Sequence, residues 1–253
     1  MKTLENKVVL ITGGSRGIGK ATAKLCLAEG AKVMLVARGE EKLKATAKEL
    51  NSANLEYCTA DVSKAEDVQK YTKTTLSKFK GIDIFFNNAG IEGSVKPIKD
   101  YPNTEFDSVI DINLKGVWLG CKYVIPKMND GGSVIITSSV AGLKGFSGLG
   151  AYVASKHAVV GIMRVAAIEF ADRNIRVNTL HPGPVNTRMM RSIEESISPG
   201  HAEDVKKGFE EDILFKRYAE PEEIAQSVLF LASNASKYIT GTMHIIDGGM
   251  AVG

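Results

Sequence analysis

A tyrosine and a lysine that could share a proton-transfer site lie four residues apart, in the segment Tyr152-Val-Ala-Ser-Lys156. Helical residues four apart lie on one face, so the two side chains meet if this segment is a helix. A free phenol has a pKa of about 10, too high for an efficient acid or base near neutral pH. A cation about 4 Å away contributes roughly 4 kcal/mol at an effective dielectric constant of 20, or at most about three pK units. We therefore expect Lys156 to bring the pKa of Tyr152 into the working range, although the pair alone could be an aromatic beside a solvated lysine.

A glycine-rich turn near the start of the chain could bind a phosphate. It reads Thr12-Gly13-Gly14-Ser15-Arg16-Gly17-Ile18-Gly19, between a short apolar run and an amphipathic stretch. Glycine is needed where the backbone turns sharply and where a phosphate approaches N–H groups without a Cβ in the way. A turn between a predicted strand and a predicted helix indicates a dinucleotide site, and a purely structural turn is the alternative.

The end of the second predicted strand indicates which dinucleotide binds. An acidic residue there would accept hydrogen bonds from the adenosine ribose 2′-OH and repel a 2′-phosphate. Here the strand ends in Arg38, whose guanidinium can pair with that phosphate, and Arg16 could join it from the glycine turn. The sequence predicts NADP(H) over NAD(H), with NAD(H) possible; the alternative is that Arg38 starts the next loop and faces water.

These residues must be positioned by short strands that alternate with longer helices. The apolar runs predict seven strands, at Lys7–Thr12, Lys32–Ala37, Leu55–Ala60, Ile82–Phe86, Ser133–Ser138, Ile175–Leu180 and Thr242–Ile246. Helical periodicity covers Gly17–Glu29, Glu40–Leu50, 64–78, 104–128, 151–171 and 221–232. Strands alternating with helices favour a doubly wound α/β (Rossmann) fold with a seven-stranded parallel sheet, helices on both faces and one domain over residues 1–253.

A stretch at about 189–216 breaks this alternation. It is apolar but interrupted by Ser198-Pro199-Gly200. We expect a lid over a substrate pocket, and the alternative is an extra helix pair packed on the core.

Composition excludes several other classes of protein. The 253 residues carry 32 basic and 29 acidic side chains, so no charge excess argues for nucleic acid. No run of about 18 uncharged apolar residues predicts a membrane span, and no signal-peptide core precedes the first glycines. Three cysteines without a CxxC pair argue against a disulfide framework and for a reducing, cytoplasmic compartment. No cluster has metal-ligand spacing, so we expect no metal site.

Five ordered motifs across the chain resemble the short-chain dehydrogenase/reductase family. Besides the T-G-x-x-x-G-x-G turn, they are Asn87-Asn88-Ala89-Gly90, Asn113, Tyr152-Val-Ala-Ser-Lys156 with Ser139 thirteen residues upstream, and Pro182-Gly183-Pro184-Val185-Asn186-Thr187. The resemblance implies an NADP(H)-preferring oxidoreductase that interconverts a ketone and a secondary alcohol. Relatives of this length are often homotetramers that pack the helices near 104–128 and 151–171, and the last helix and strand, against their mates.

The resemblance also implies a role for each motif residue. Tyr152 would exchange a proton with the substrate oxygen and Ser139 would hold that oxygen. Lys156 would also bind the nicotinamide ribose, and Asn113 would keep a water in a proton relay. The dinucleotide would contact Gly13, Ser15, Arg16, Gly17, Ile18, Gly19, Arg38, Asp61, Val62, Asn88, Ala89, Gly90, Tyr152, Lys156, Pro182, Gly183, Val185 and Thr187.

Three nearby residues leave alternatives. Ser138 competes with Ser139, but the spacing to Tyr152 favours Ser139 and makes Ser138 a strand-end residue. His157 projects about 100° around the helix from Lys156, so we expect packing or solvent exposure. His181 stands where the family more often has a small residue or Asn, and we expect it to form a pocket wall.

The substrate itself is not defined by the motifs. Its walls would come from Ile91–Pro97, Leu143–Gly150 and Met189–Phe215, whose apolar character favours a medium-sized, largely apolar ketone. A 3-oxoacyl-thioester reductase is the alternative enzyme. A non-catalytic dinucleotide-binding regulatory protein is the alternative of a different class, and it would not need all four catalytic positions filled.

Overall fold

Strand β1 (Val8–Thr12) is buried along its whole length, as its unbroken apolar run predicts. Successive strand residues point to opposite faces of a sheet. Val9 and Ile11 accordingly pack into one hydrophobic cluster and Leu10 into another. A strand buried on both sides requires helices above and below it.

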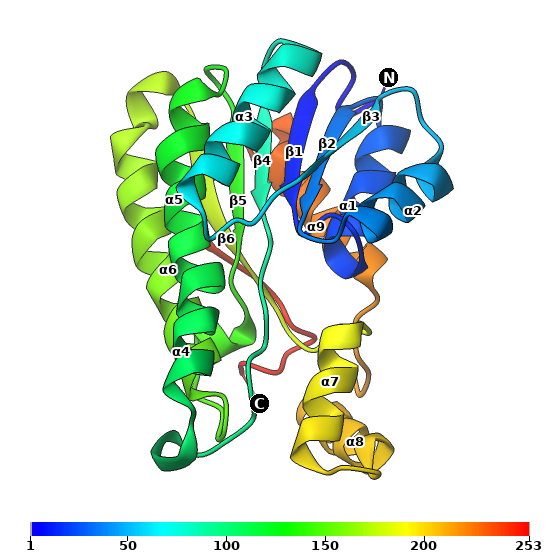
Figure 1. Cartoon of the computed structure of the whole chain (residues 1–253), viewed down its shortest axis with the longest axis vertical. Helices are drawn as coiled ribbons and strands as arrows, with labels where there is room; N and C mark the ends of the chain where they lie inside the picture. Colours follow the sequence, from blue (N-terminus) through cyan, green and yellow to red (C-terminus); the bar gives the residue numbers. More distant parts are fainter. Residues whose placement is uncertain (1, 253) are drawn as a thin grey trace.

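The computed structural model describes residues 2–252 and contains one parallel sheet between two layers of helices (Figure 1). The strand order is β3-β2-β1-β4-β5-β6-β7. The other strands are β2 (Lys32–Ala37), β3 (Leu55–Thr59), β4 (Ile84–Asn87), β5 (Ser133–Thr137), β6 (Arg176–Pro182) and β7 (Met243–Ile246). The order reverses between β1 and β4, which is where open α/β sheets bind ligands at their carboxyl edge.

The two helical layers follow from the two clusters. On one face lie α1 (Gly17–Ala28), α2 (Glu40–Leu50) and α9 (Pro221–Ala232), and on the other lie α3 (Ala65–Phe79), α5 (Gly116–Val124) and α6 (Gly150–Glu169). Helix α6 is long and apolar enough to cross a membrane by length and composition alone. It packs along β6 as a core helix, however, and carries both Tyr152 and Lys156.

The predicted helix over 104–128 is present but not uniform. It consists of α4 (Asn103–Ile110), a wider π turn over Asp111–Lys115, α5, and a short 3₁₀ turn over Ile125–Lys127. Such π turns are rare and occur mostly as single turns within α-helices, frequently at functional sites. This one contains Asn113.

The segment that breaks the alternation forms two helices, α7 (Arg188–Ile197) and α8 (Ala202–Asp212). The interruption between them includes Gly200 in the left-handed region, at φ +78°. In Figure 1 the pair extends below the sheet, opposite α4. Its inner face joins a small third cluster around Val140, Ile213, Tyr218 and Met250.

Candidate active site

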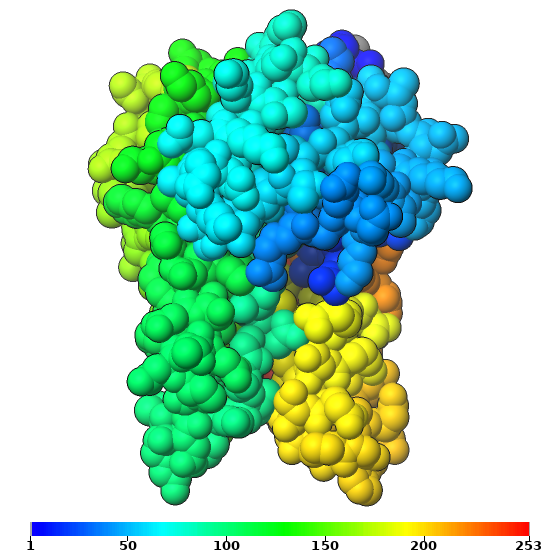
Figure 2. Space-filling model, in the orientation of Figure 1, coloured from blue at the N-terminus to red at the C-terminus, as the bar shows by residue number. Residues whose placement is uncertain are grey.

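A cleft of about 1390 Å³ lies at the carboxyl edge of the sheet. Figure 2 shows the surface hollowed between the segment around α4 and the α7–α8 pair. Most of the residues assigned to the dinucleotide line this cleft: Gly13, Ser15, Arg16, Gly17, Ile18, Arg38, Asp61, Val62, Asn88, Ala89, Gly90, Tyr152, Lys156, Pro182, Gly183, Val185 and Thr187. Ser139 lines it too, whereas Gly19 and Asn113 lie behind its wall.

The glycine turn leaves no room for side chains. Gly13 has φ +69°, and a Cβ there would lie 2.9 Å from the amide nitrogen of Asn88. A Cβ on Gly19 would collide with the carbonyl oxygen of Gly13, so Gly19 supports the turn although it does not line the cleft. Helix α1 begins at Gly17 and directs its free N–H groups into the cleft. The turn therefore fits the phosphates of a dinucleotide.

Thr12 fixes the neighbouring turn and was not among the assigned site residues. Its hydroxyl accepts hydrogen bonds from the backbone N–H of Asn88 at 2.9 Å and of Ala89 at 3.0 Å. The Asn88 amide in turn donates to the Thr12 carbonyl at 3.0 Å. Its position in the sequence could have identified Thr12, because it begins the glycine motif and ends β1, which pairs with β4.

Tyr152 and Ser139 form the reactive part of the cleft. Tyr152 lies in the first turn of α6 and Ser139 follows β5, and both side chains line the cleft. The Ser139 hydroxyl accepts a hydrogen bond from the N–H of Ala141 at 3.1 Å. The buried Ser138 hydroxyl instead donates to the backbone carbonyl of Lys156 at 2.8 Å. Lys156 Nζ lies 5.5 Å from the centre of the Tyr152 ring and donates to the Thr137 carbonyl at 2.8 Å. Because the Ser138 hydroxyl is bound to the backbone of α6, Ser139 stays the predicted partner of the tyrosine.

Burial determines the proton affinities of the tyrosine and the lysine. It raises the pKa of Tyr152 to about 12; the nearby Ser139 hydroxyl opposes this rise, and the charge of Glu92 adds to it. It lowers the pKa of Lys156 to about 8. The predicted lowering of the Tyr152 pKa by Lys156 is therefore wrong for this structure, because burial disfavours the charged form of both groups. Tyr152 keeps its proton at neutral pH.

Asn113 holds the loop after β4 in place. Its side-chain oxygen accepts from the N–H of Ile91, and its amide donates to the Ile91 carbonyl, both at 2.9 Å. The same amide contacts the hydroxyl of Ser155 at 3.2 Å, which in turn donates to the Tyr152 carbonyl. Both Asn113 and Lys156 border Gly90. Ser155, within the Y-x-x-x-K segment, is a supporting residue that spacing alone did not single out.

The two histidines near the motifs behave differently. His157 is exposed and contacts the Val153 carbonyl at 2.9 Å, which confirms the expected surface position. His181 is fully buried and does not line the cleft, so the prediction of a pocket wall is wrong. Its ring nitrogens contact the Ser139 carbonyl and the Thr179 hydroxyl, both at 2.9 Å. Burial lowers the pKa of His181, so the neutral ring supports Ser139 from behind.

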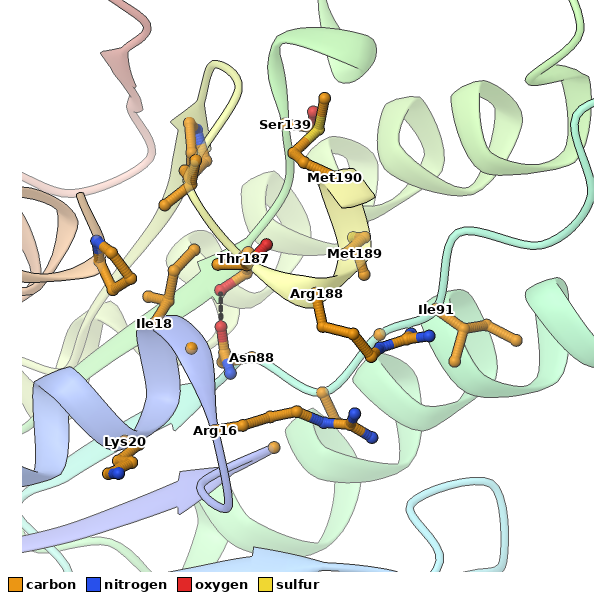
Figure 3. A pocket seen from close by; sticks show the side chains of 18 of the residues that line it. Arg16, Ile18, Lys20, Asn88, Ile91, Ser139, Thr187, Arg188, Met189 and Met190 are labelled. Carbon is orange, nitrogen blue, oxygen red and sulfur yellow. Dashed lines mark hydrogen bonds between the residues drawn. The ribbon is translucent and has the colours of Figure 1, made fainter. Parts of the chain in front are cut away.

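The end of the cleft beside β2 is lined by charged side chains of both signs, among them Arg16, Arg38, Glu40 and Glu41. The guanidinium groups of Arg16 and Arg38 are exposed, and neither makes an ion pair within residues 2–252. Burial opposes ionisation of Asp61, but hydrogen bonds from Ser63 and the charge of Arg38 together lower the pKa of Asp61. In Figure 3 Arg16 extends from the glycine turn across the cleft.

Apolar side chains line the other end of the cleft. Of the predicted walls, the structure places there Ile91, Phe146, Leu149, Met189, Met190, Ile193 and Phe209. Val95 and Leu143 do not reach the cleft, and Leu214 and Phe215 point to solvent. Met250, from the C-terminal segment, completes this wall and was not predicted. Within residues 2–252 no group of three His, Cys, Asp or Glu side chains could hold a metal ion.

The cleft combines a glycine turn that suits a pyrophosphate with the protonated phenol of Tyr152 and the buried amine of Lys156. On a doubly wound fold this combination defines a nucleotide-dependent oxidoreductase. A family model described as enoyl-(acyl carrier protein) reductase matches residues 13–251. Levodione reductase of Leifsonia aquatica is 42% identical, over 97% of this chain and 94% of that protein. Cyclohexanol dehydrogenase of Acinetobacter sp. (strain SE19) is 35% identical, over 96% and 94%. The crystal structure of levodione reductase superposes with a TM-score of 0.95 at 39% identity, over 98% of each chain.

The chain belongs to the short-chain dehydrogenase/reductase family. It is an oxidoreductase that acts on secondary alcohols or the corresponding ketones with a nicotinamide dinucleotide.

Proposed function

We propose that this protein reduces a medium-sized, largely apolar cyclic ketone to a secondary alcohol with NADPH, and catalyses the reverse oxidation. One observation carries the proposal: Tyr152, which keeps its proton at neutral pH, and Ser139 both line a cleft that is apolar on its substrate side. The relatives named for levodione and cyclohexanol support a cyclic substrate.

Each reactive side chain has one task. Tyr152 donates its proton to the carbonyl oxygen in reduction and removes it from the alcohol in oxidation. The Ser139 hydroxyl holds that oxygen, a fixed donor where negative charge develops. Lys156 binds the nicotinamide ribose, and Asn113 keeps a water in a relay from Lys156 to solvent. When bound, the nicotinamide supplies or accepts the hydride.

The preference for NADPH rests on Arg38 and Arg16. Both line the cleft at its adenosine end and lack an acidic partner within the described chain. A guanidinium with free donors favours a 2′-phosphate, which it binds through charge-assisted hydrogen bonds. The glycine turn, Asp61, Val62, Asn88 and the residues after β6 would hold the rest of the dinucleotide.

The α7–α8 pair serves as a lid over the substrate in this proposal. Met189, Met190 and Ile193 on α7 face the cleft, and Phe209 on α8 joins them. A lid that contributes apolar surface excludes water from the reacting atoms.

We also infer a cytoplasmic homotetramer. Exposed apolar side chains lie on the helices and strand that would meet their mates: Trp118 on α5, Val165 and Ile168 on α6, and Met243 and Ile245 on β7. Large exposed apolar side chains on these elements support protein–protein contacts there. Light scattering should give four times the chain mass, and Ile168→Asp should yield smaller species.

The test is a panel of cyclic and open-chain ketones, alcohols and acyl thioesters with both cofactors, followed near 340 nm. We expect the highest kcat/KM for an apolar cyclic ketone with NADPH. A second candidate is reduction of the 3-oxo group of a 3-oxoacyl thioester, and the description of the matching family model, which names acyl carrier protein, supports it. A clear preference for thioesters over simple ketones would replace the first proposal by the second.

A further inference from the structure

Glu92 is a buried carboxylate to which the proposed mechanism gives no task. Its side chain is 10% exposed, and its Oε2 atom has no hydrogen-bond partner within residues 2–252. The backbone beside it is fixed, because Asn113 binds both the N–H and the carbonyl of Ile91. A buried, incompletely bonded carboxylate is costly, so its presence requires a reason.

The other oxygen of Glu92 binds the first residue of α7. Nη2 of Arg188 donates to Oε1 at 2.8 Å, while 55% of the arginine side chain is exposed. Of the ion pairs within the described residues, this one alone joins the α7–α8 pair to the rest of the chain. Figure 3 shows Arg188 extending from the start of α7 toward the loop that carries Ile91.

The charge of Glu92 also reaches Tyr152. Three other titratable groups lie near the phenol: Lys156 on α6, 5.5 Å from its ring, His181 on β6 behind Ser139, and Glu92 after β4. The loop that carries Glu92 is tied to the Tyr152 carbonyl through Asn113 and Ser155. Burial lowers the pKa of His181, so its ring is neutral at pH 7, whereas Lys156, with a pKa lowered to about 8, still carries its charge there. Glu92, in contrast, adds to the effect of burial and raises the pKa of Tyr152. Arg188 is the cation that offsets this negative charge.

We propose that Glu92 is a positioning residue whose ion pair with Arg188 seats α7 over the cleft and, by the same contact, neutralises the negative charge facing Tyr152. Proton transfer by Tyr152 is thereby coupled to the position of the lid. Glu92 does not line the cleft, so it acts through Arg188 and Tyr152 and not on the substrate. This inference rests on the proposed role of Tyr152.

The two ends of the ion pair should shift the pH profile in opposite directions. Alcohol oxidation requires the phenolate, so its rate rises as the pH approaches the raised pKa of Tyr152. Glu92→Gln removes the negative charge and should move this rising limb to lower pH by about half to one unit. Arg188→Met leaves the carboxylate unpaired and should move the limb to higher pH by a similar amount. Arg188→Lys keeps the cation and should restore the wild-type limb.

Seating of the lid has its own readout. Arg188→Met should raise the KM for the alcohol by about threefold to tenfold, because the ionic contact that holds α7 is lost. Asp130→Asn is the matched control, since it removes the carboxylate partner of Arg173, also at 2.8 Å, on the surface. This variant should leave unchanged both the rising limb of the pH profile and the KM for the alcohol.

Unmoved limbs in both Glu92→Gln and Arg188→Met, or limbs that move in the same direction, overturn the inference. A second measurement does not depend on turnover: the tyrosinate absorbance of each variant minus that of its Tyr152→Phe counterpart, titrated upward from neutral pH. The phenolate should form at lower pH in Glu92→Gln than in the wild type, and equal titrations contradict the inference. If Tyr152→Phe keeps its activity, the proposed function is wrong. The absorbance titration does not depend on activity, so in that case it still tests whether the charge of Glu92 acts on Tyr152.

Discussion

The two ends of the cleft are built by different physical means. At the dinucleotide end, backbone groups form the surface, and glycines at 13 and 19 keep it clear of side chains. At the substrate end, side chains from α7, α8, the loop after β5 and the C-terminal segment form the surface. The first end is defined by local sequence. The second depends on contacts between residues far apart in the chain.

This difference predicts how each end responds to substitution. A binding surface formed by main-chain groups does not tolerate an added side-chain atom, because the main chain cannot move away without breaking its own hydrogen bonds. A site lined by flexible methionines can repack, so losses there are graded. Changes at the dinucleotide end should therefore abolish binding or alter its specificity, while changes at the substrate end should alter KM.

Among substitutions that compare the two ends of the cleft, Gly19→Ala should have the largest effect. The added Cβ would collide with the Gly13 carbonyl and displace the phosphate-binding turn. We expect NADPH affinity to fall about 100-fold or more, as measured by quenching of protein fluorescence. Gly208→Ala in α8 is the control, since its Cβ meets nothing within 4 Å and should leave affinity unchanged. Wild-type affinity in Gly19→Ala would show that the turn does not hold the phosphates.

Arg38→Asp should change cofactor choice. An aspartate at the end of β2 repels a 2′-phosphate and accepts hydrogen bonds from a 2′-OH. We expect the ratio of kcat/KM for NADPH to that for NADH to fall about 100-fold. Lys127→Asp, an exposed charge change in the short turn after α5, should leave that ratio as it is. An unchanged ratio in Arg38→Asp would contradict the assignment to NADP(H).

Met190→Ala should weaken substrate binding and spare the dinucleotide. Met190 lines the cleft and packs against the cluster around Tyr218 and Met250. Its truncation removes apolar contact worth about 1–2 kcal/mol, so KM for a cyclic ketone should rise about fivefold to thirtyfold. Met190→Leu, which conserves volume, should stay near the wild type. Equal losses for ketone and NADPH would mean that α7 belongs to the dinucleotide site.

The smallest effect is expected from Glu194→Gln. Burial raises the pKa of Glu194, although Tyr218 donates to it at 2.9 Å and Arg191 pairs with it at 2.7 Å. The stabilising contribution of a group with a raised pKa is present at low pH and is lost as the pH rises through that pKa. The glutamine variant should therefore gain about 2 °C in Tm at neutral pH, and this gain should vanish in acid. A lower Tm than the wild type at neutral pH would show that the Arg191 pair outweighs burial.

Much of this molecule could be predicted from sequence because its determinants are local. Apolar runs predicted the seven strands, and the spacing to Tyr152 favoured Ser139, the serine that acts on the pKa of that tyrosine. Spacing carries no information on burial, however, and burial reverses the expected pKa change of Tyr152.

Contacts between distant residues set a second limit. Glu92 and Arg188 lie 96 residues apart and carry no motif. The π turn at Asn113 requires one extra residue in a helix whose apolar periodicity looks continuous. His181 lies on strand β6, where neighbouring residues point to opposite faces of the sheet. An error of one position in the predicted register therefore moves a side chain from the cleft to the interior.

The central claim is that Tyr152 transfers the proton that accompanies hydride transfer to a ketone. The most direct measurement is incorporation of deuterium from NADPH labelled at the nicotinamide C4 into the carbinol carbon of the product, in wild type and Tyr152→Phe at saturating cofactor. We expect labelled alcohol from the wild type and a rate lower by about 100-fold to 10,000-fold in the variant, with NADPH binding intact. Equal rates of labelled product from both proteins would contradict the account.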